Sequence, residues 1–382
     1  MEEQLLFSVA KLSDEEVANA LGIPYDAPAD APAANTGTKR AQAQPHEVYL
    51  GSPDDQLDLF DNLPEYSLLP TEWQNKTLRN WDNDERYIPI EIAISAVFTI
   101  GNNKEPRVSF TRESIPILDK NYDLYYTGIE LRQADELIWL QLLHLNRGQQ
   151  PLGLPLMFKP ARFLEELNLT PGAENYRHLK ESMHRLQATT IELYSKRLKK
   201  SKTFRLVCHF DFEDENHYPL PHWKVVLDPR LFYLLQNRYH ARMSFRRKKL
   251  LGSGLASKLH SYFACHRRPI DREIDDYFRL CIGNDSLLSR RYMDQRRLKR
   301  SSAESKTLAD KYVKQRHRSF RRDLEQALQR LCGPDVNFLK SYQFYKKNGI
   351  VFVSVERNNI DDLPGQAQFN LNDEAILADS VY

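Results

Sequence analysis

One order of predicted elements occurs twice between about residues 125 and 358, and this repeat constrains the fold more than any other feature. In each copy the apolar periodicity predicts three helices, which are followed by two strands. Each predicted helix has one apolar face and each strand has one buried side, so every copy can close a small core of its own. Three helices followed by a β-hairpin is the order of a winged helix-turn-helix domain.

The first copy follows three strands, which are predicted over residues 88–100, 107–110 and 122–127. Its three helices are expected over residues 130–145, 159–168 and 174–193. Apolar residues at alternate positions from Phe204 to Phe212 predict a strand over residues 202–212, and a second strand over residues 223–227 completes the hairpin. Asp228 and Pro229 suit the first turn of a further helix that ends near Arg238.

The second copy has helices predicted over residues 254–267, 270–281 and 305–331. Gly333 and Pro334 are expected to end the last of them. Strands over residues 337–345 and 350–355 follow, and Asn348-Gly349 lies between them. This dipeptide is the most favoured two-residue loop of a β-hairpin, so a hairpin is predicted here.

The expected fold class is α+β and helix-rich, with two tandem winged helix-turn-helix domains preceded by a largely disordered acidic N-terminal arm. The arm covers residues 1–87, where the stretch from Pro24 to Pro45 has almost nothing to bury. The first domain, with its N-terminal strands, covers residues 88–240, and the second covers residues 241–358. An acidic C-terminal tail covers residues 359–382.

Charge is distributed very unevenly along the chain. Residues 1–120 hold 10 Lys and Arg against 21 Asp and Glu, which is a net charge of −11. Since the whole chain carries +2, the remaining residues carry +13. A basic body of this kind suits a polyanionic partner, and the acidic arm suits another role.

The third helix of the second copy has an apolar side that includes Val313, Phe320 and Leu324. On its opposite side, contacts to base edges are expected from Lys311, Gln315, Arg318, Ser319 and Arg322. Arginine pairs with guanine and glutamine with adenine in the major groove. Flanking contacts to phosphates are expected from Lys314, Arg316 and Arg321. A merely solvated face is the alternative, which the position of this helix before a hairpin disfavours.

Three further groups of cations are candidate DNA contacts. On the third helix of the first copy they are Arg177, His184 and Arg185. This helix also carries acidic residues, so its outer face fits a DNA contact and a plain solvent face equally well. Between the copies, phosphate contacts are expected from Arg246, Arg247, Lys248 and Lys249, with a solvated linker as the alternative. A similar basic loop is expected from Arg290 to Arg300, and the second hairpin tip offers Lys346 and Lys347.

A short motif lies outside both expected domains, on the acidic arm. It consists of Gln56, Leu57, Asp58, Leu59 and Phe60. This pentapeptide resembles the one by which bacterial replication proteins bind the sliding clamp. Leu59 and Phe60 would fill an apolar pocket, Gln56 would hydrogen-bond beside it, and no core-building role explains the motif on such a segment.

Residues that would support catalysis are sparse. The sequence has no GxxxxGK[ST] loop for ATP, and no pair of histidines near a tyrosine suggests a relaxase. Cys208, His209, His217 and His222 match no common metal-ligand spacing. We therefore expect no catalytic residue, no metal and no other cofactor, and a protein that is not an enzyme. A nickase that uses the acidic residues near Asp211 is a weaker alternative.

The four cysteines form no CxxC pair, which argues against a disulfide framework and fits a reducing cytoplasm. The longest apolar stretch, residues 88–100, is too short to span a bilayer, and no signal peptide opens the chain. A cytoplasmic protein without a membrane partner is therefore expected.

Several stretches resemble the TrfA-type replication initiators of bacterial plasmids. They are Tyr126 to Arg132, Asp135 to Trp139, Arg185 to Thr189, and Phe278 to Cys281 with Gly283, Asp285 and Ser286. The resemblance covers about residues 50–356, and the pentapeptide precedes the folded part at a comparable place. The sequence departs from the family in its N-terminal arm, in a basic insertion around residues 287–310 and in a tail after about residue 357.

This resemblance implies an initiator that binds directly repeated sites (iterons) in double-stranded origin DNA. It further implies help in melting adjacent AT-rich DNA, recruitment of the host helicase with DnaA, contact with the sliding clamp, and homodimers that limit copy number. The expected function is therefore initiation of plasmid DNA replication. A winged-helix transcriptional repressor is the alternative that the fold alone would fit equally well.

Overall fold

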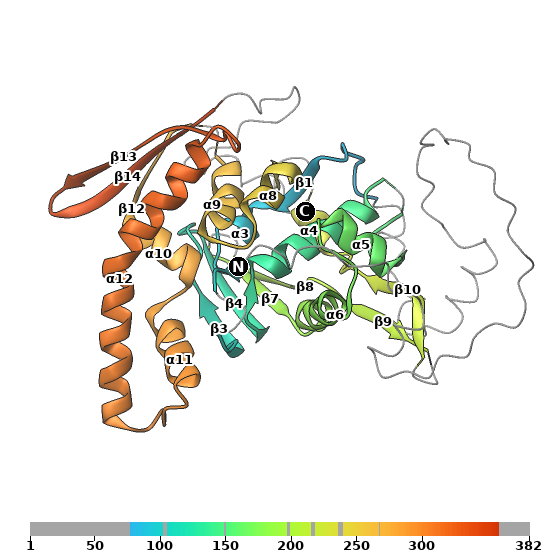
Figure 1. Ribbon diagram of the computed structural model, residues 1–382, viewed down its shortest axis with the longest axis horizontal. Coiled ribbons are helices and arrows are strands. Elements are labelled where there is room, and N and C mark those ends of the chain that lie inside the picture. The colour runs from blue at the N-terminus through green and yellow to red at the C-terminus, as the bar shows by residue number, and fades with distance from the viewer. Residues whose placement is uncertain are drawn as a thin grey trace, which may run out of the picture.

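The computed structural model describes residues 77–101, 105–148, 150–196, 199–214, 218–235, 240–266 and 268–358. These residues form a mixed α/β fold, and their buried apolar side chains join into one hydrophobic core (Figure 1). The predicted tail and most of the predicted arm, including the pentapeptide at residues 56–60, lie outside the described residues. Within the described ranges, no helix is both long enough and apolar enough to cross a lipid bilayer.

The described chain begins with a ladder that joins distant parts of the sequence. Strand β1 (Glu85–Pro89) pairs antiparallel with β11 (His240–Ser244), so the predicted domain boundaries at 87/88 and 240/241 fall inside this ladder. The single strand predicted over residues 88–100 is wrong, because β1 is followed by helix α3 (Ile90–Ala93) and strand β2 (Phe98–Thr99). Residues 88–99 are all buried, and so their apolar pattern has no period that distinguishes helix from strand.

A four-stranded sheet of order β3-β4-β7-β8 joins two hairpins that lie far apart in the sequence. Its strands are β3 (Ser109–Ile115), β4 (Tyr122–Ile129), β7 (Thr190–Ser195) and β8 (Lys200–Arg205). The helix predicted over residues 174–193 is therefore wrong at its end, where β-branched Thr190 and Ile191 pair with β4. The strand predicted over residues 202–212 is in fact two strands, which buried Leu206 and Val207 connect.

The first unit consists of α4 (Gln133–Asn146), β6 (Pro155–Phe158), α5 (Pro160–Glu166), α6 (Ala173–Gln187), β9 (His209–Glu213) and β10 (Pro219–Val226). The predicted three helices and hairpin are confirmed, although their ends differ. Strand β6 was not predicted, and its pairing with β10 gives the sheet order β6-β10-β9. The helix predicted from Asp228 is the short α7 (Leu231–Leu234), and residues 236–239 lie outside the description.

The second unit consists of α9 (Leu255–Ala264), β12 (Ile270–Glu273), α10 (Ile274–Ile282), α11 (Asp285–Gln295), α12 (Ala303–Cys332), β13 (Leu339–Lys347) and β14 (Ile350–Arg357). The long helix and the hairpin are confirmed, and Asn348 and Gly349 have the positive φ angles of 53° and 80° that this turn requires. The helix predicted over residues 270–281 is wrong at its start, where β12 pairs with β14. The predicted basic loop from Arg290 is also wrong, because α11 includes its first half.

The two units share one strand order. In each unit the strand before the second helix pairs with the last strand of the hairpin, as β6 does with β10 and β12 with β14. In each unit a helix precedes the hairpin, α6 in the first and α12 in the second, although the β7–β8 hairpin intervenes after α6. The short helix α8 (Phe245–Leu251) lies between the units along the chain. Helices α6 and α12 therefore occupy equivalent places in the two topologies.

Candidate nucleic-acid interface

Helix α12 is held on the second unit by one apolar side. The side chain of Ser302 caps its start by accepting a hydrogen bond from the backbone N–H three residues later. Val313, Phe320, Leu324 and Leu328 are buried, and the helix packs against α9 and α11. Their spacing of seven and four residues keeps these side chains on one face. The opposite face is therefore left to solvent.

This solvent face carries most of the predicted base and phosphate contacts. Its six exposed side chains, called the cationic face below, are Lys311, Lys314, Gln315, Arg318, Arg321 and Arg322. At 3.6 residues per turn they occupy about a third of the helix circumference. Residues 311–322 contain no Asp or Glu, so the charge of this face is not neutralised within it. Such a surface attracts polyanions.

Two of the predicted contacts on α12 face the protein more than solvent. Arg316 is half-buried, and its Nη1 lies 3.3 Å from Asp323 Oδ2 and 3.2 Å from the Ser319 hydroxyl. Ser319 also donates a hydrogen bond to the backbone carbonyl of Arg316. These bonds orient the side chains of Arg316 and Ser319 along the helix. By contrast, 76% of the Arg322 side chain is exposed, and its nearest carboxylate oxygen, on Asp323, is 3.9 Å away.

The hairpin β13–β14 adjoins the cationic face. The guanidinium of Arg321 lies 5.4 Å from the centre of the Phe344 ring on β13, which connects helix and hairpin. Lys346 and Lys347 are exposed at the end of β13, directly before the Asn348-Gly349 turn. Figure 1 shows this hairpin extending from the body of the molecule beyond α12. Its tip thus offers cations next to those of the helix.

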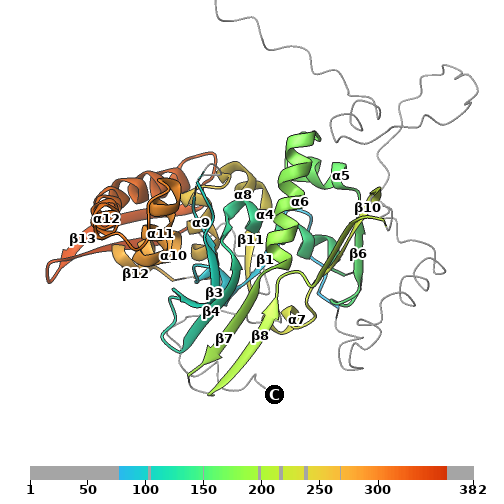
Figure 2. The ribbon, with the colours of Figure 1, turned by 90° about the horizontal axis from the view of Figure 1, so that it is seen from below.

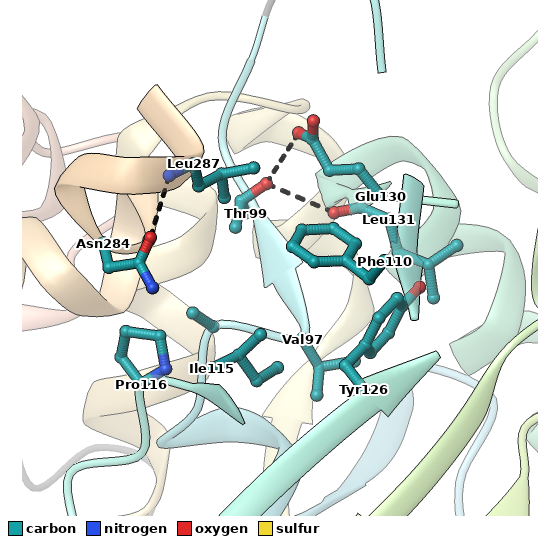
Figure 3. Close-up of a pocket in the computed structure, with 12 residues that line it drawn as sticks. Val97, Thr99, Phe110, Ile115, Pro116, Tyr126, Glu130, Leu131, Asn284 and Leu287 are labelled. Carbon is teal, nitrogen blue, oxygen red and sulfur yellow. Dashed lines mark hydrogen bonds between the residues drawn. The ribbon is translucent and has the colours of Figure 1, made fainter. Parts of the chain in front are cut away.

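Helix α11 fixes the second unit against the four-stranded sheet. Gly283 has φ +97°, and a Cβ there would lie 2.5 Å from a Leu287 methyl group, so only glycine fits this turn. Asn284 then caps α11 by accepting a hydrogen bond from the Leu287 N–H. Figure 3 shows Asn284 and Leu287 across a small pocket from Phe110 and Tyr126 of the sheet. The start of α11 therefore lies at the contact between the second unit and the four-stranded sheet, which is called the seam below.

The two arginines at the centre of α11 are bound to the first half of the chain. Arg290 makes two hydrogen bonds to Glu113, at 2.8 and 2.7 Å. Arg291 is buried and donates to both carboxylate oxygens of Glu130, at 2.5 and 3.0 Å. Burial alone would raise the pKa of Glu130, but Arg291 and Arg132 outweigh it and hold that pKa below its ordinary value. These two arginines stabilise the seam and are not available to phosphates.

The four basic residues on α8 also include some that face solvent and some that bind within the protein. Arg246 is exposed, as a phosphate contact requires, whereas Arg247 and Lys249 donate to the backbone carbonyls of Val336 and Glu166. The side chain of Lys248 is only 1% exposed. Four acceptors, which belong to Gln133, Glu136, Ser257 and Ser261, lie 2.7–3.0 Å from its ammonium group and use all three of its N–H donors. The prediction that Lys248 binds phosphate is wrong, because its charge is buried and fully bonded.

Lys248 instead neutralises a carboxylate at the centre of the molecule. Glu136 lies on α4 and is buried, with its Oε1 2.8 Å from Lys248 Nζ. Burial alone would raise the pKa of Glu136, but Lys248 and the buried Lys258 hold it below the ordinary value. This pair joins the first unit to the helix that leads into the second.

Helix α6 presents fewer free cations than α12. Arg177 is exposed, but it forms ion pairs with Glu174 and Glu181 on the same helix, at 2.8 and 2.9 Å. Arg185 donates twice to the buried carboxylate of Asp135, at 3.1 and 2.9 Å. The prediction of Arg185 as a DNA contact is therefore wrong, because its guanidinium is committed to this internal carboxylate.

His184 is exposed on α6 beside the first hairpin. Its ring packs edge-on against Phe210 and Phe212 of β9, with centroids 5.5 and 5.3 Å apart. Partial burial lowers the pKa of His184, so its neutral form is favoured. A neutral imidazole can still form a hydrogen bond to DNA but contributes little electrostatic attraction.

Sites for catalysis are not evident in the described ranges. No group of three or more His, Cys, Asp or Glu is placed there to hold a metal ion. At the proposed acidic hairpin, Asp211 Oδ1 lies 2.7 Å from the imidazole of His209, and residues 215–217 lie outside the description.

A family model described as "TrfA protein" matches residues 74–312 of the chain, which is more than half of its length. The chain belongs to the TrfA family. The resemblance predicted from the sequence is therefore confirmed. The TrfA match ends at Tyr312 inside α12, so most of the cationic face and the β13–β14 hairpin lie beyond it. It also excludes the pentapeptide at residues 56–60.

A curated relative, the plasmid replication initiator protein TrfA from Escherichia coli, is 28% identical to this chain over 241 residues. The alignment covers 63% of this chain and 58% of that protein, so the chain matches less than two thirds of the relative's length. The TrfA-like stretches lie in β4 to α4, at the end of α6, and in α10 with the turn at Gly283.

Two crystal structures of domains 2 and 3 of RctB are also similar. One, of the selenomethionine derivative, is 14% identical with a TM-score of 0.40 and covers 71% of this chain and 98% of that one. The other is also 14% identical, with a TM-score of 0.38 and coverages of 69% and 96%. A TM-score below 0.5 does not establish a shared fold, so the architecture of this TrfA-family chain rests on its own strand pairing.

Proposed function

We propose that this chain initiates plasmid replication by binding double-stranded origin DNA through two winged-helix units. The observation that carries the proposal is the cationic face of α12, five exposed cations and a glutamine on the helix that precedes a lysine-tipped hairpin. Membership of the TrfA family supports the same conclusion independently.

The winged-helix assignment is supported by the shared topology. In both units a strand after the first helix joins a β-hairpin as its third strand, in the orders β6-β10-β9 and β12-β14-β13. In such domains the helix before the hairpin enters the major groove, and the hairpin contacts the backbone. We propose α12 as the helix that contacts bases, and α6, whose cations are mostly paired, as a contact to the backbone.

Binding to the plasmid's own origin tests this function. In a mobility-shift assay the protein is expected to form a ladder of complexes on a fragment with several direct repeats, one complex for each repeat. Affinity should fall steeply with salt, because phosphate contacts release counterions. Equal affinity for scrambled repeats would contradict recognition of the repeats. A preference for a promoter palindrome would instead favour the transcriptional repressor.

We also propose that this chain acts without catalysis of its own. The nickase alternative predicts that supercoiled origin plasmid becomes open-circular when it is incubated with the protein and Mg²⁺. Unchanged supercoiled plasmid is the result that we expect, with a site-specific nicking enzyme as the positive control.

The pentapeptide at residues 56–60 is proposed to bind the bacterial sliding clamp. Replacing Leu59 and Phe60 by alanine removes both apolar anchors and is expected to lower clamp binding at least tenfold, since each buried side chain contributes about 1.5–3 kcal/mol. Origin binding should not change, because the motif contains none of the proposed DNA contacts. A pull-down with purified clamp measures the loss, and an unaffected pull-down would make the pentapeptide a chance match.

Other partners follow from family membership. We propose that the chain recruits the host helicase together with DnaA, aids melting of AT-rich origin DNA, and forms homodimers that limit copy number. These roles are proposals for the whole protein, since the chain matches 58% of the Escherichia coli relative.

A further inference from the structure

The β7–β8 hairpin is an addition to the first unit that the proposed function does not use. It lies in the chain between α6 and β9, where the second unit passes directly from α12 into its hairpin. Its strands extend the sheet from β4, with β8 at the edge. Figure 2 shows the hairpin extending from the body of the molecule, apart from both α12 and the β13–β14 hairpin.

The second half of this hairpin is strongly cationic, whereas β7 carries Glu192, which forms an ion pair with Arg112. Residues 196–205 include six Lys and Arg and no Asp or Glu. Lys199, Lys200 and Lys202 are exposed, and none of them forms an ion pair with a carboxylate of the described residues. By contrast, Lys196 at the end of β7 is paired with Asp123, at 2.7 Å. The end of the hairpin therefore presents three lysines to solvent.

Packing explains only one of these lysines, and only in part, because the Lys202 ammonium group lies 5.2 Å from the centre of the Tyr233 ring. Both sides of β8 are exposed from Lys200 to Thr203, and only Phe204 reaches the core. Lys199 has φ +50°, a conformation that glycine or asparagine adopts at lower cost. Three like charges close together also repel one another. Neutral residues at these positions would therefore make the folded protein more stable.

Protection of the sheet edge is the competing explanation. Lysines on an edge strand prevent it from pairing with a strand of another molecule. Glutamates would protect the edge equally well, because what matters there is a charge of either sign. A polyanionic ligand requires that the charges be positive, whereas protection of the edge does not, and this difference separates the two explanations by experiment.

We propose that the end of the β7–β8 hairpin binds DNA phosphates outside the segment that α12 contacts, with Lys199, Lys200 and Lys202 as the contacts. The inference rests on the proposed DNA-binding function. Lysine suits this role because it is a flexible point charge that follows a phosphate without base preference. The hairpin would thereby add affinity without adding sequence specificity.

The experiment measures the salt dependence of binding to DNA of arbitrary sequence. Anisotropy titrations of the full chain would use one labelled duplex and one labelled single strand at several salt concentrations. Three variants are compared with the wild type: K199E/K200E/K202E, its charge-preserving control K199R/K200R/K202R, and R318A/R322A on α12. Both hairpin triple variants keep charged residues on the edge strand. If the triple glutamate variant is unstable, K200E/K202E reverses two of the charges and leaves the turn residue Lys199 unchanged.

For the glutamate variant, the slope of log affinity against log salt on the duplex should become shallower by about 0.9 for each lost contact, and so by roughly 2 to 3. The arginine variant should keep the wild-type slope. A change with the single strand alone would also support the phosphate site and would identify melted DNA as its ligand. Slopes that stay unchanged on both DNAs, while R318A/R322A lowers affinity, would overturn the hairpin site and leave the proposed function standing. A wild type that binds neither DNA would overturn both.

Discussion

Replacing Arg318 and Arg322 together by alanine is expected to abolish specific binding to origin DNA. Both side chains are exposed on the cationic face of α12, and neither supports the core. A bidentate contact from arginine to guanine discriminates against other bases by about 1–3 kcal/mol. Two lost contacts should therefore cost about 2–6 kcal/mol, which is roughly a thirtyfold loss of affinity or more.

Competition mobility-shift assays with origin and scrambled fragments measure this loss. Gln329→Ala is a matched control, because this residue is exposed on the same helix five turns after Lys311. The control and the double variant should both keep the wild-type melting temperature. If the double variant bound the origin as tightly as the control does, α12 would not be the base-contacting helix.

Replacing Lys248 by alanine is expected to lower the free energy of unfolding by about 3–5 kcal/mol. The substitution removes the ammonium group that lies 2.8 Å from the buried carboxylate of Glu136, and only the more distant charge of Lys258 remains. Gln133 and Ser261 also lose the donor from which their oxygens accept. An uncompensated charge in the interior costs far more than a lost surface contact. Urea denaturation followed by circular dichroism measures the difference.

Two comparisons make the interpretation of Lys248 specific. Arg246→Ala changes an exposed cation in the same helix and should alter stability by less than about 0.5 kcal/mol. Combining Lys248→Met with Glu136→Gln removes both charges and should recover part of the lost stability. The account would be wrong if Lys248→Ala left stability unchanged and weakened DNA binding, as the phosphate contact predicted from the sequence requires.

Features governed by local sequence were predictable. The turn at Asn348-Gly349 depends on the φ angles of two adjacent residues, and α12 depends on apolar residues spaced by three and four. The cationic face follows directly from that helix, since the side opposite Val313 and Phe320 must be exposed. Family membership was predictable as well, from stretches such as Tyr126 to Arg132.

The roles of the other cations depend on distant partners. Lys248 lies 112 positions from Glu136, and Arg291 lies 161 positions from Glu130, so no local pattern separates them from exposed neighbours such as Arg246. A weak signal was present in the acidic residues: Glu130, Asp135 and Glu136 lie around the start of a helix whose following residues, 137–143, are mostly apolar. Buried carboxylates require buried cations, and this sequence offers basic runs to supply them.

The β7–β8 hairpin was missed for a related reason. Thr190 and Ile191 continue the apolar spacing of α6, so the sequence assigned β7 to that helix. Phe204 continues the alternation of β9, so the sequence assigned β8 to that strand. Only the pairing of β7 with β4, whose residues precede it by more than sixty positions, separates them. Such tertiary pairing overrides local propensity.

The most direct test of the central claim is methylation protection of origin DNA by dimethyl sulfate. This reagent modifies guanine N7 in the major groove and adenine N3 in the minor groove. If the cationic face of α12 lies in the major groove, the wild-type protein should protect guanine N7 atoms in every repeat, and R318A/R322A should not. Bound repeats whose guanine N7 atoms react freely, with protection confined to adenine N3, would contradict the account.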